Sequence, residues 1–250
     1  MLRPLWVSLR QLFLPAHCAA CGSPAPPDRL LPLCEPCGRR LARLLEAKYC
    51  GRCGRGAGPY AYDTGGCAAC RDRSHPYDAV VRVGPYEEPL RSLILRYKYS
   101  RRVELAPLLG RFLAERFALV TWADRVDVVV PVPLHWTRQM RRGFNQAEAV
   151  ARALVGTAGP RLVGKRLLRV RPTPHQTRLP LSRRAANVHG AFEVRGRHAG
   201  LEGKRVLLVD DVMTSGSTLA ECARTLRRGG AAAVYAAVVA VAGADESGLW

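Results

Sequence analysis

Apolar positions beyond about residue 75 follow two patterns in alternation. Short continuous apolar runs predict buried strands, at residues 80–83, 126–132, 206–209 and 234–241. Apolar residues spaced three and four apart predict helices, at residues 89–99, 104–119, 145–154 and 217–228. Strands that alternate with helices are typical of an α/β domain with a mainly parallel sheet flanked by helices, so we predict that architecture.

The segment before this pattern is rich in Gly, Pro and Cys and has little apolar periodicity. We therefore divide the chain into a small unit over residues 1–75 and an α/β domain over residues 76–250. So short a unit buries too little apolar area to fold alone, and we expect bound metal to stabilise it. Leu41, Leu44 and Leu45 predict one short helix within it. Residues 1–15 predict an amphipathic helix that lacks the apolar region of a signal peptide.

Cysteines cluster in the small unit, where four Cys-x-x-Cys pairs lie between residues 18 and 70. Two such pairs supply the four thiolates of a closed tetrahedral zinc site, so we predict two structural Zn²⁺ ions. Consecutive pairing is favoured, and the spacing leaves interleaved pairing open. His17 and His75 are expected to be exposed neighbours, because eight thiolates already fill two sites. The predicted ligands are Cys18, Cys21, Cys34, Cys37, Cys50, Cys53, Cys67 and Cys70.

The chain is strongly basic, with a formal net charge of +19 and a pI near 10.4. This charge favours polyanionic partners, either nucleic acid or a phosphate-rich small molecule, although an ordinary arginine-rich surface has the same composition. The longest apolar run, residues 231–242, is shorter than the roughly 18 residues of a membrane span. We expect no membrane span and a cytoplasmic location.

Residues 206–218 carry the chemistry that is easiest to interpret. A buried strand leads to Asp210 and Asp211 at the edge where α/β proteins bind ligands. The small and hydroxyl-bearing turn after them opens a helix and forms a cradle for a phosphate; it consists of Thr214, Ser215, Gly216, Ser217 and Thr218. Carboxylates repel phosphate but accept hydrogen bonds from sugar hydroxyls, so the pattern predicts a ribose 5-phosphate site. The assignment requires the acids and the turn to face one space with room for an anion.

Residues 127–146 contain a second candidate site. A strand ends at Pro131 and Pro133, and a basic loop with Arg138, Arg141 and Arg142 follows. Guanidinium groups at the carboxyl end of a strand can bind a pyrophosphate through paired hydrogen bonds. His135 and His175 are interpreted as structural, and Cys222 as a core residue on an apolar helix face.

Residues 206–218 closely resemble the phosphoribosyl-pyrophosphate motif of type I phosphoribosyltransferases. With the PVP and RGFNQ sequences of 131–133 and 142–146, with LRYKYSR at 95–101, and with residues 171–192, the chain is similar to the ComF family of phosphoribosyltransferase-like proteins. That family also carries an N-terminal cysteine-knuckle domain. The resemblance therefore implies a type I phosphoribosyltransferase fold behind a double zinc ribbon.

The resemblance also implies an activity and a set of site residues. Asp210 and Asp211 would hold the ribose hydroxyls and Thr214 to Thr218 the 5′-phosphate of 5-phosphoribosyl-1-pyrophosphate. Arg138 and Arg142, with Mg²⁺, would neutralise the departing pyrophosphate, and Arg184 lies on the family pattern. Lys98 either reaches the pyrophosphate or is a solvated lysine at a helix end, and we favour the latter.

Three further implications follow from the family. Residues 173–187 form either a mobile lid over the site or an ordinary loop. The acceptor is a nitrogenous base or amine that the sequence does not identify. The family's role implies DNA uptake in natural transformation, with single-stranded DNA and other competence proteins as partners. The alternative is a non-catalytic accessory or regulatory protein that binds single-stranded DNA and senses the phosphoribosyl ligand.

Overall fold

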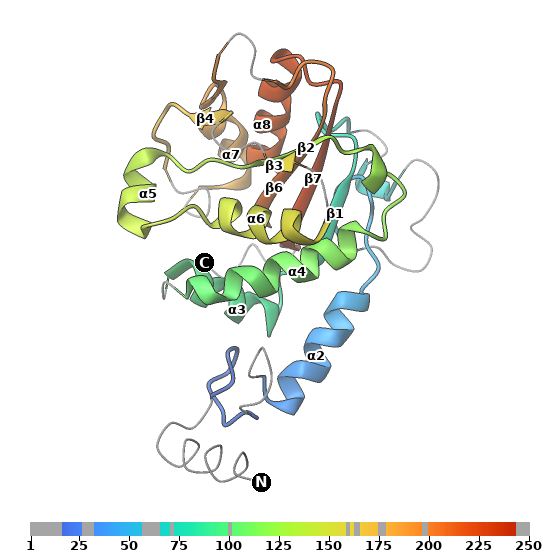
Figure 1. Cartoon of the computed structure of the whole chain (residues 1–250), viewed down its shortest axis with the longest axis vertical. Helices are drawn as coiled ribbons and strands as arrows, with labels where there is room; N and C mark the ends of the chain where they lie inside the picture. The colour runs from blue at the N-terminus through green and yellow to red at the C-terminus, as the bar shows by residue number, and fades with distance from the viewer. Residues whose placement is uncertain are drawn as a thin grey trace.

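Five parallel strands form the central sheet of this computed structural model (Figure 1). The structure describes residues 17–26, 33–56, 66–70, 73–99, 102–158, 161–162, 166–174, 179–196 and 200–243. The predicted helix over residues 1–15 lies outside them. In spatial order the strands are β1 (Val80–Pro85), β7 (Ala233–Val241), β6 (Arg205–Met213), β2 (Val128–Pro131) and β3 (Arg161–Leu162). The predicted parallel α/β class is confirmed.

Alternate residues of the central strands belong to two different hydrophobic cores. Leu207 and Val209 of β6 pack into one core, whereas Val206 and Leu208 pack into the other. Because successive side chains of a strand point to opposite faces, an apolar run fills both cores at once. This explains why the strand sequences are continuously apolar.

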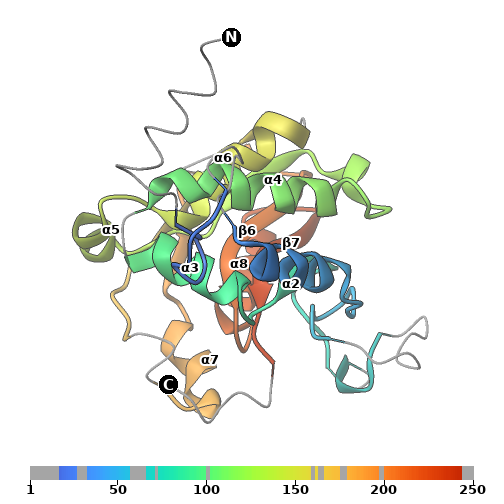
Figure 2. The same cartoon turned by 90° about the horizontal axis from the view of Figure 1, so that it is seen from below.

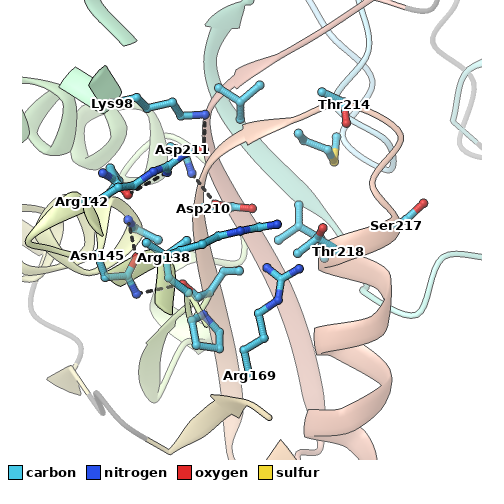
Figure 3. Close-up of a pocket in the computed structure, with 18 of the residues that line it drawn as sticks. Lys98, Arg138, Arg142, Asn145, Arg169, Asp210, Asp211, Thr214, Ser217 and Thr218 are labelled. Atoms are coloured by element: carbon cyan, nitrogen blue, oxygen red, sulfur yellow. Dashed lines mark hydrogen bonds and ion pairs between the residues drawn. The ribbon is translucent and has the colours of Figure 1, made fainter. Parts of the chain in front are cut away.

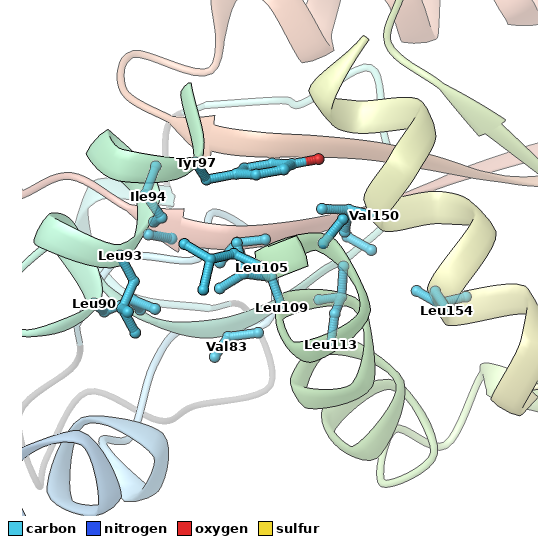
Figure 4. Packing of buried hydrophobic residues seen from close by; sticks show 14 of the residues in the cluster. Val83, Leu90, Leu93, Ile94, Tyr97, Leu105, Leu109, Leu113, Val150 and Leu154 are labelled. Carbon is cyan, nitrogen blue, oxygen red and sulfur yellow. The ribbon is translucent and has the colours of Figure 1, made fainter. Parts of the chain in front are cut away.

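Helices cover both faces of the sheet. One face packs against α3 (Leu90–Tyr99), α4 (Ala106–Phe117) and α6 (Gln146–Ala158), whose apolar side chains interlock in Figure 4. The other face packs against α8 (Ser217–Arg228). Figure 2 shows β6 and β7 between α4 and α6 on one side and α8 on the other. Each of these helices was predicted from its apolar spacing.

Several short elements were not predicted. Residues 136–142, expected as a basic loop, form α5 (Trp136–Arg142). Residues 173–187, expected as a lid or loop, include most of α7 (Leu181–Val188), so that stretch is helical in part. An antiparallel pair, β4 (Leu167–Arg169) and β5 (Phe192–Val194), lies beside them. These elements lack the continuous apolar run of the buried strands, and each is too short to show a helical period.

The described residues of the cysteine-rich unit contain little regular structure, as its composition predicts. They include α2 (Glu35–Glu46), where the leucines predicted a helix, and the single turn η1 (Ala68–Cys70). Two more 3₁₀ turns, η2 (Val103–Leu105) and η3 (Ala123–Arg125), flank α4. Among the described residues, no helix combines the length and the hydropathy needed to cross a bilayer.

Candidate functional site

A cavity of about 430 Å³ opens at the carboxyl ends of β2 and β6 (Figure 3). Its walls come from segments far apart in the sequence: the end of α3, the exit of β2, α5, β4, the end of β6 and the start of α8. Parallel strands place their carboxyl ends at one edge of a sheet, which explains why these segments meet. The acids Asp210 and Asp211 and the turn from Thr214 to Thr218 all line this one cavity.

Asp210 and Asp211 are consecutive residues of β6 and have different surroundings. The strand continues to Met213, past the predicted end at residue 209, so both acids lie within it. Because successive side chains of a strand point to opposite faces, Asp211 points towards α3 and Asp210 towards α8. The cavity extends around the end of the strand, so both residues line it. The two carboxylates therefore approach a ligand from different sides.

Burial at the cavity wall, together with the neighbouring charge of Asp211, raises the pKa of Asp210 to about 7. The backbone N–H of Asp211 donates to Asp210 Oδ1 at 2.8 Å and opposes the rise. A carboxyl group with such a pKa changes its charge near neutral pH, as is typical of functional groups in clefts.

Lys98 is the partner of Asp211. Its Nζ lies 2.9 Å from Asp211 Oδ1, and the two side chains are 17% and 13% exposed. Burial lowers the pKa of Lys98, but the charge and the hydrogen bond of Asp211 outweigh burial and leave that pKa raised. Lys98 therefore contributes a charged side chain to the cavity wall. The interpretation of Lys98 as a solvated lysine at a helix end was wrong.

The turn that begins α8 is half-buried and open to the cavity. Gly216 has φ +76°, a left-handed conformation that favours glycine and lets the chain enter the helix. Ser215 Oγ and Ser217 Oγ lie 2.9 Å apart. The N–H groups of a helix N-terminus, together with hydroxyl donors, suit a phosphate.

Two of the predicted arginines line the wall opposite the turn. Arg138 donates from Nη2 to the carbonyl oxygen of Thr173, and Arg142 donates from Nη1 to Gln146 Oε1 at 3.2 Å. Both belong to α5, whose N-terminus is capped by His135, so the interpretation of His135 as structural is supported.

Asn145 caps α6 through Oδ1 and donates to the carbonyl oxygen of Val132, which fixes the exit of β2.

Two cavity residues were missed by the sequence analysis. Arg169 of β4 points into the cavity in Figure 3, and its Nε is buried without a hydrogen bond in the described structure. Gln146 is almost fully buried, and its Nε2 is also without a bond there. Buried donors without partners are rare and indicate a place for ligand atoms or water. The sequence held an indication for each: Gln146 ends the RGFNQ sequence of residues 142–146, and Arg169 lies next to residues 171–192.

Other predicted residues lie away from this cavity. Arg184 is buried and donates from Nε to the carbonyl oxygen of Leu179 at 3.0 Å; it is not among the described residues that line the cavity. Cys222 is fully buried in the core, and burial raises the pKa of its thiol, as expected of a core residue. His175 lies outside the described residues.

The eight remaining cysteines gather into two groups of four, in consecutive order along the chain. Within each group the sulfur atoms all lie within 4.8 Å of one another. Zinc–sulfur bonds of about 2.3 Å place tetrahedral ligands roughly 3.8 Å apart. The measured separations include 3.6 Å for Cys21 and Cys34 and 3.9 Å for Cys50 and Cys70, so both groups suit structural zinc.

The two histidines near the clusters differ in exposure. His17 is exposed, as expected. His75 is partly buried, with Nε2 at 3.6 Å from Cys70 Sγ, so its predicted exposure was wrong.

Comparison with known proteins agrees with this geometry. Residues 120–248, about half of the chain, match the family model described as a phosphoribosyl transferase domain. YhgH of Salmonella typhimurium, a DNA utilization protein, is 33% identical over 205 residues, which cover 81% of this chain and 87% of that protein. Competence protein F of Haemophilus influenzae is 34% identical over 199 residues, which cover 78% of this chain and 84% of that protein.

The likeness to solved structures is partial. The allosteric regulatory enzyme of purine biosynthesis is 23% identical with a TM-score of 0.40; the match covers 58% of this chain and only 30% of that chain. The matching domain model and the curated relatives show that the chain belongs to the ComF family of phosphoribosyltransferase-like proteins.

Proposed function

We propose that this protein binds 5-phosphoribosyl-1-pyrophosphate and transfers its phosphoribosyl group to a nitrogen-containing acceptor. The observation that carries the proposal is the single cavity shared by the acidic pair and the turn from Thr214 to Thr218. Sugar hydroxyls donate to carboxylates, and a phosphate accepts from a helix N-terminus. A phosphorylated sugar offers hydroxyls to the acidic pair and a phosphate to the turn in one molecule.

The cations of the cavity suit the other end of the ligand. Lys98, Arg138 and Arg142 lie on the side of α3 and α5, across β6 from the start of α8 (Figure 3). With the 5′-phosphate at the turn and the ribose beside Asp210 and Asp211, a pyrophosphate on C1 extends towards these cations. Paired hydrogen bonds from arginine suit phosphate oxygens better than a point charge does.

We expect Mg²⁺ to bind together with the pyrophosphate of the substrate, not in a separate protein site. Mg²⁺ binds oxygen ligands and keeps several waters, and it is held by one or two carboxylates together with substrate phosphates. Asp211 is already paired with Lys98 at 2.9 Å, so the described acids do not form a cage of their own. The ion would travel with the pyrophosphate and neutralise charge on its oxygens.

The proposed reaction breaks one bond and forms another at C1 of the ribose. The lone pair of the acceptor nitrogen forms the new C–N bond, the C–O electrons leave with the pyrophosphate, and the acceptor proton passes to solvent. Lys98, Arg138 and Arg142 would stabilise the charge of the leaving group. Asp210 and Asp211 would hold the sugar, and their negative charge favours a cationic, oxocarbenium-like C1.

The biological role follows from the relatives, which are described as a DNA utilization protein and competence protein F. We propose that this chain acts in the cytoplasm in the handling of DNA taken up by the cell. Its net charge of +19 suits single-stranded DNA as a partner. The second candidate is a non-catalytic factor that binds the DNA and senses the phosphoribosyl ligand.

Calorimetry with 5-phosphoribosyl-1-pyrophosphate and Mg²⁺ tests the site. We expect saturable binding by the natural chain, and we expect the double variant Asp210→Asn/Asp211→Asn to lose affinity by at least about 100-fold, since each carboxylate hydrogen bond contributes about 1.5–3 kcal/mol. The charge-matched control Glu115→Gln/Asp124→Asn removes two exposed acids far from the cavity and should bind normally. Equal binding by the two double variants would refute the site.

Release of pyrophosphate across a panel of nucleobases and amines then separates the two candidate functions. Release with one acceptor, abolished in the Asp210/Asp211 variant, establishes the transferase. Ligand binding without release from any acceptor favours the sensing factor.

A further inference from the structure

The second cysteine cluster, Cys50, Cys53, Cys67 and Cys70, lies directly behind the turn that begins α8. A small cavity of about 40 Å³ separates them. Cys53 and Tyr77 line it on one side, and Met213, Thr214 and Ser215 line it on the other. The same three residues, 213 to 215, also line the large cavity. The start of the turn therefore separates the large cavity from the small cavity beside the cysteine cluster.

The knuckle, which is the turn that carries Cys50 and Cys53 and ends at Gly54, is packed tightly against the ends of sheet strands. Gly54 has φ +73°, and a Cβ there would lie 3.0 Å from Met213 Cε and 3.0 Å from Val241 Cγ2. The backbone N–H of Val80 donates to the carbonyl oxygen of Gly51 at 2.7 Å. The knuckle is therefore fixed against β1, β6 and β7, and it contacts the residue that immediately precedes the turn.

A second connection runs through two rings. His75 Nε2 lies 3.6 Å from Cys70 Sγ, and the His75 ring stacks on Tyr77 with centroids 5.1 Å apart. Tyr77 is buried, and its hydroxyl donates to Met213 Sδ at 3.9 Å. A Cβ on Gly216 would lie 3.4 Å from the same hydroxyl oxygen. The Tyr77 hydroxyl therefore lies close to Met213, which precedes Thr214, and to Gly216, which follows Ser215.

We propose that the second cysteine cluster, through Tyr77 and Met213, positions the turn from Thr214 to Gly216 for the 5′-phosphate, so that metal held by this cluster raises affinity for phosphorylated ribose. The proposal rests on the function proposed above. A turn that is already held in its binding conformation loses less entropy when it binds a ligand. Tyr77 and Met213 are positioning residues, because they act on the phosphate through the turn.

Two cysteine variants compare the two clusters. Cys53→Ser removes a ligand of the second cluster and Cys37→Ser one of the first, and each should lower the zinc content by about one ion per chain. We expect Cys53→Ser to weaken ribose 5-phosphate binding by about tenfold or more, and Cys37→Ser to change it by less than about twofold. Magnesium pyrophosphate, which should bind at Lys98, Arg138 and Arg142, should bind Cys53→Ser about as well as the natural chain.

Loss of both ligands to the same degree in Cys53→Ser would mean general loosening and would overturn the proposal. Unchanged ribose 5-phosphate binding, with one zinc lost, would overturn it as well. If Cys53→Ser does not fold, Tyr77→Ala and Tyr77→Phe replace it. The alanine variant should lose ribose 5-phosphate binding selectively, and the phenylalanine variant, which keeps the stacked ring but lacks the hydroxyl that reaches Met213 and Gly216, should show a smaller loss of the same kind.

Hydrogen exchange separates this proposal from the proposed function. Amides of residues 212–218 should exchange faster in Cys53→Ser than in Cys37→Ser without any ligand present. If the natural chain fails to bind 5-phosphoribosyl-1-pyrophosphate, the proposed function is refuted, and the exchange comparison still decides whether the cluster holds the turn. Equal exchange in the two variants refutes the positioning role.

Discussion

Two neighbouring carboxyl groups at the end of β6 differ in what balances their charge. Asp211 has the ammonium of Lys98 at 2.9 Å, whereas Asp210 has only the N–H of Asp211 at 2.8 Å and more distant cations. Asp210 consequently has a pKa raised to about 7. A partly buried acid without a close partner destabilises the fold, which makes Asp210 a candidate for use by a ligand.

Asp210→Asn should therefore stabilise the protein and impair the site. The native carboxyl keeps its proton up to a pH of about 7, while the unfolded chain ionises near pH 4, so the contribution of Asp210 to stability falls between these values. We expect Tm at pH 8 to rise by about 2–4 °C, a smaller rise at pH 5, and ribose 5-phosphate binding to weaken by about tenfold. Calorimetric melting and titration measure the two effects.

The control for this variant is Asp211→Asn. It leaves the buried ammonium of Lys98 without its close carboxylate, so Tm should fall. A lower Tm for Asp210→Asn at pH 8 would contradict the account given for Asp210.

At the scale of elements, the sequence allowed the frame of the fold to be predicted and left its short additions unseen. The buried runs at β1, β2, β6 and β7 are long enough to be recognised, and α8 was predicted at its observed bounds. The pair β4–β5 and the helices α5 and α7 were missed. They are held by tertiary contacts, such as the bond from Arg138 to Thr173, which no local pattern reveals.

The same limit applies to the site. Asp210, Asp211 and the turn are contiguous in the sequence and share one motif, so they were found together. Arg169 and Gln146 reach the cavity only because β4 and the start of α6 border it in the folded chain. Their role depends on burial, which the sequence does not specify.

Packing between α4 and α6 leads to a prediction about two helical glycines. A Cβ on Gly110 would overlap Ala153 and lie 2.9 Å from the carbonyl oxygen of Val150, whereas a Cβ on Gly156 would meet nothing within 4 Å. Gly110→Ala should lower the free energy of unfolding by about 1–3 kcal/mol because the core is overpacked. Gly156→Ala should raise it by about 0.5–1 kcal/mol, because alanine favours a helix. Urea denaturation measures both, and equal effects would contradict the close approach of the helices.

On the scale of the whole molecule, the cysteine-rich unit and the α/β domain share a hydrophobic core. Cys18, Ala19 and Ala20 pack with residues of α3 and β1, and so do Leu41 and Leu44 of α2. The division near residue 75 remains a prediction from composition. The shared core favours unfolding of both parts together.

Metal removal tests this directly. We expect metal analysis to give about two zinc ions per chain, and a strong chelator to lower Tm in a single transition, because metal binding is coupled to folding. Cys18→Ser, which removes the buried ligand of the first cluster, should lower Tm in the same way. A well-folded chain without metal, or an α/β domain whose transition is unaffected, would contradict the shared core.

The ion pair between Lys98 and Asp211 has one more consequence. A free sugar offers Asp211 hydroxyl donors but brings no anion to the ammonium of Lys98. Inorganic phosphate brings an anion to the ammonium but no hydroxyl donor to the carboxylate. A molecule with both groups at the right separation compensates the two partners together, so this ion pair should favour the whole of the proposed ligand over either fragment, each of which should bind more weakly.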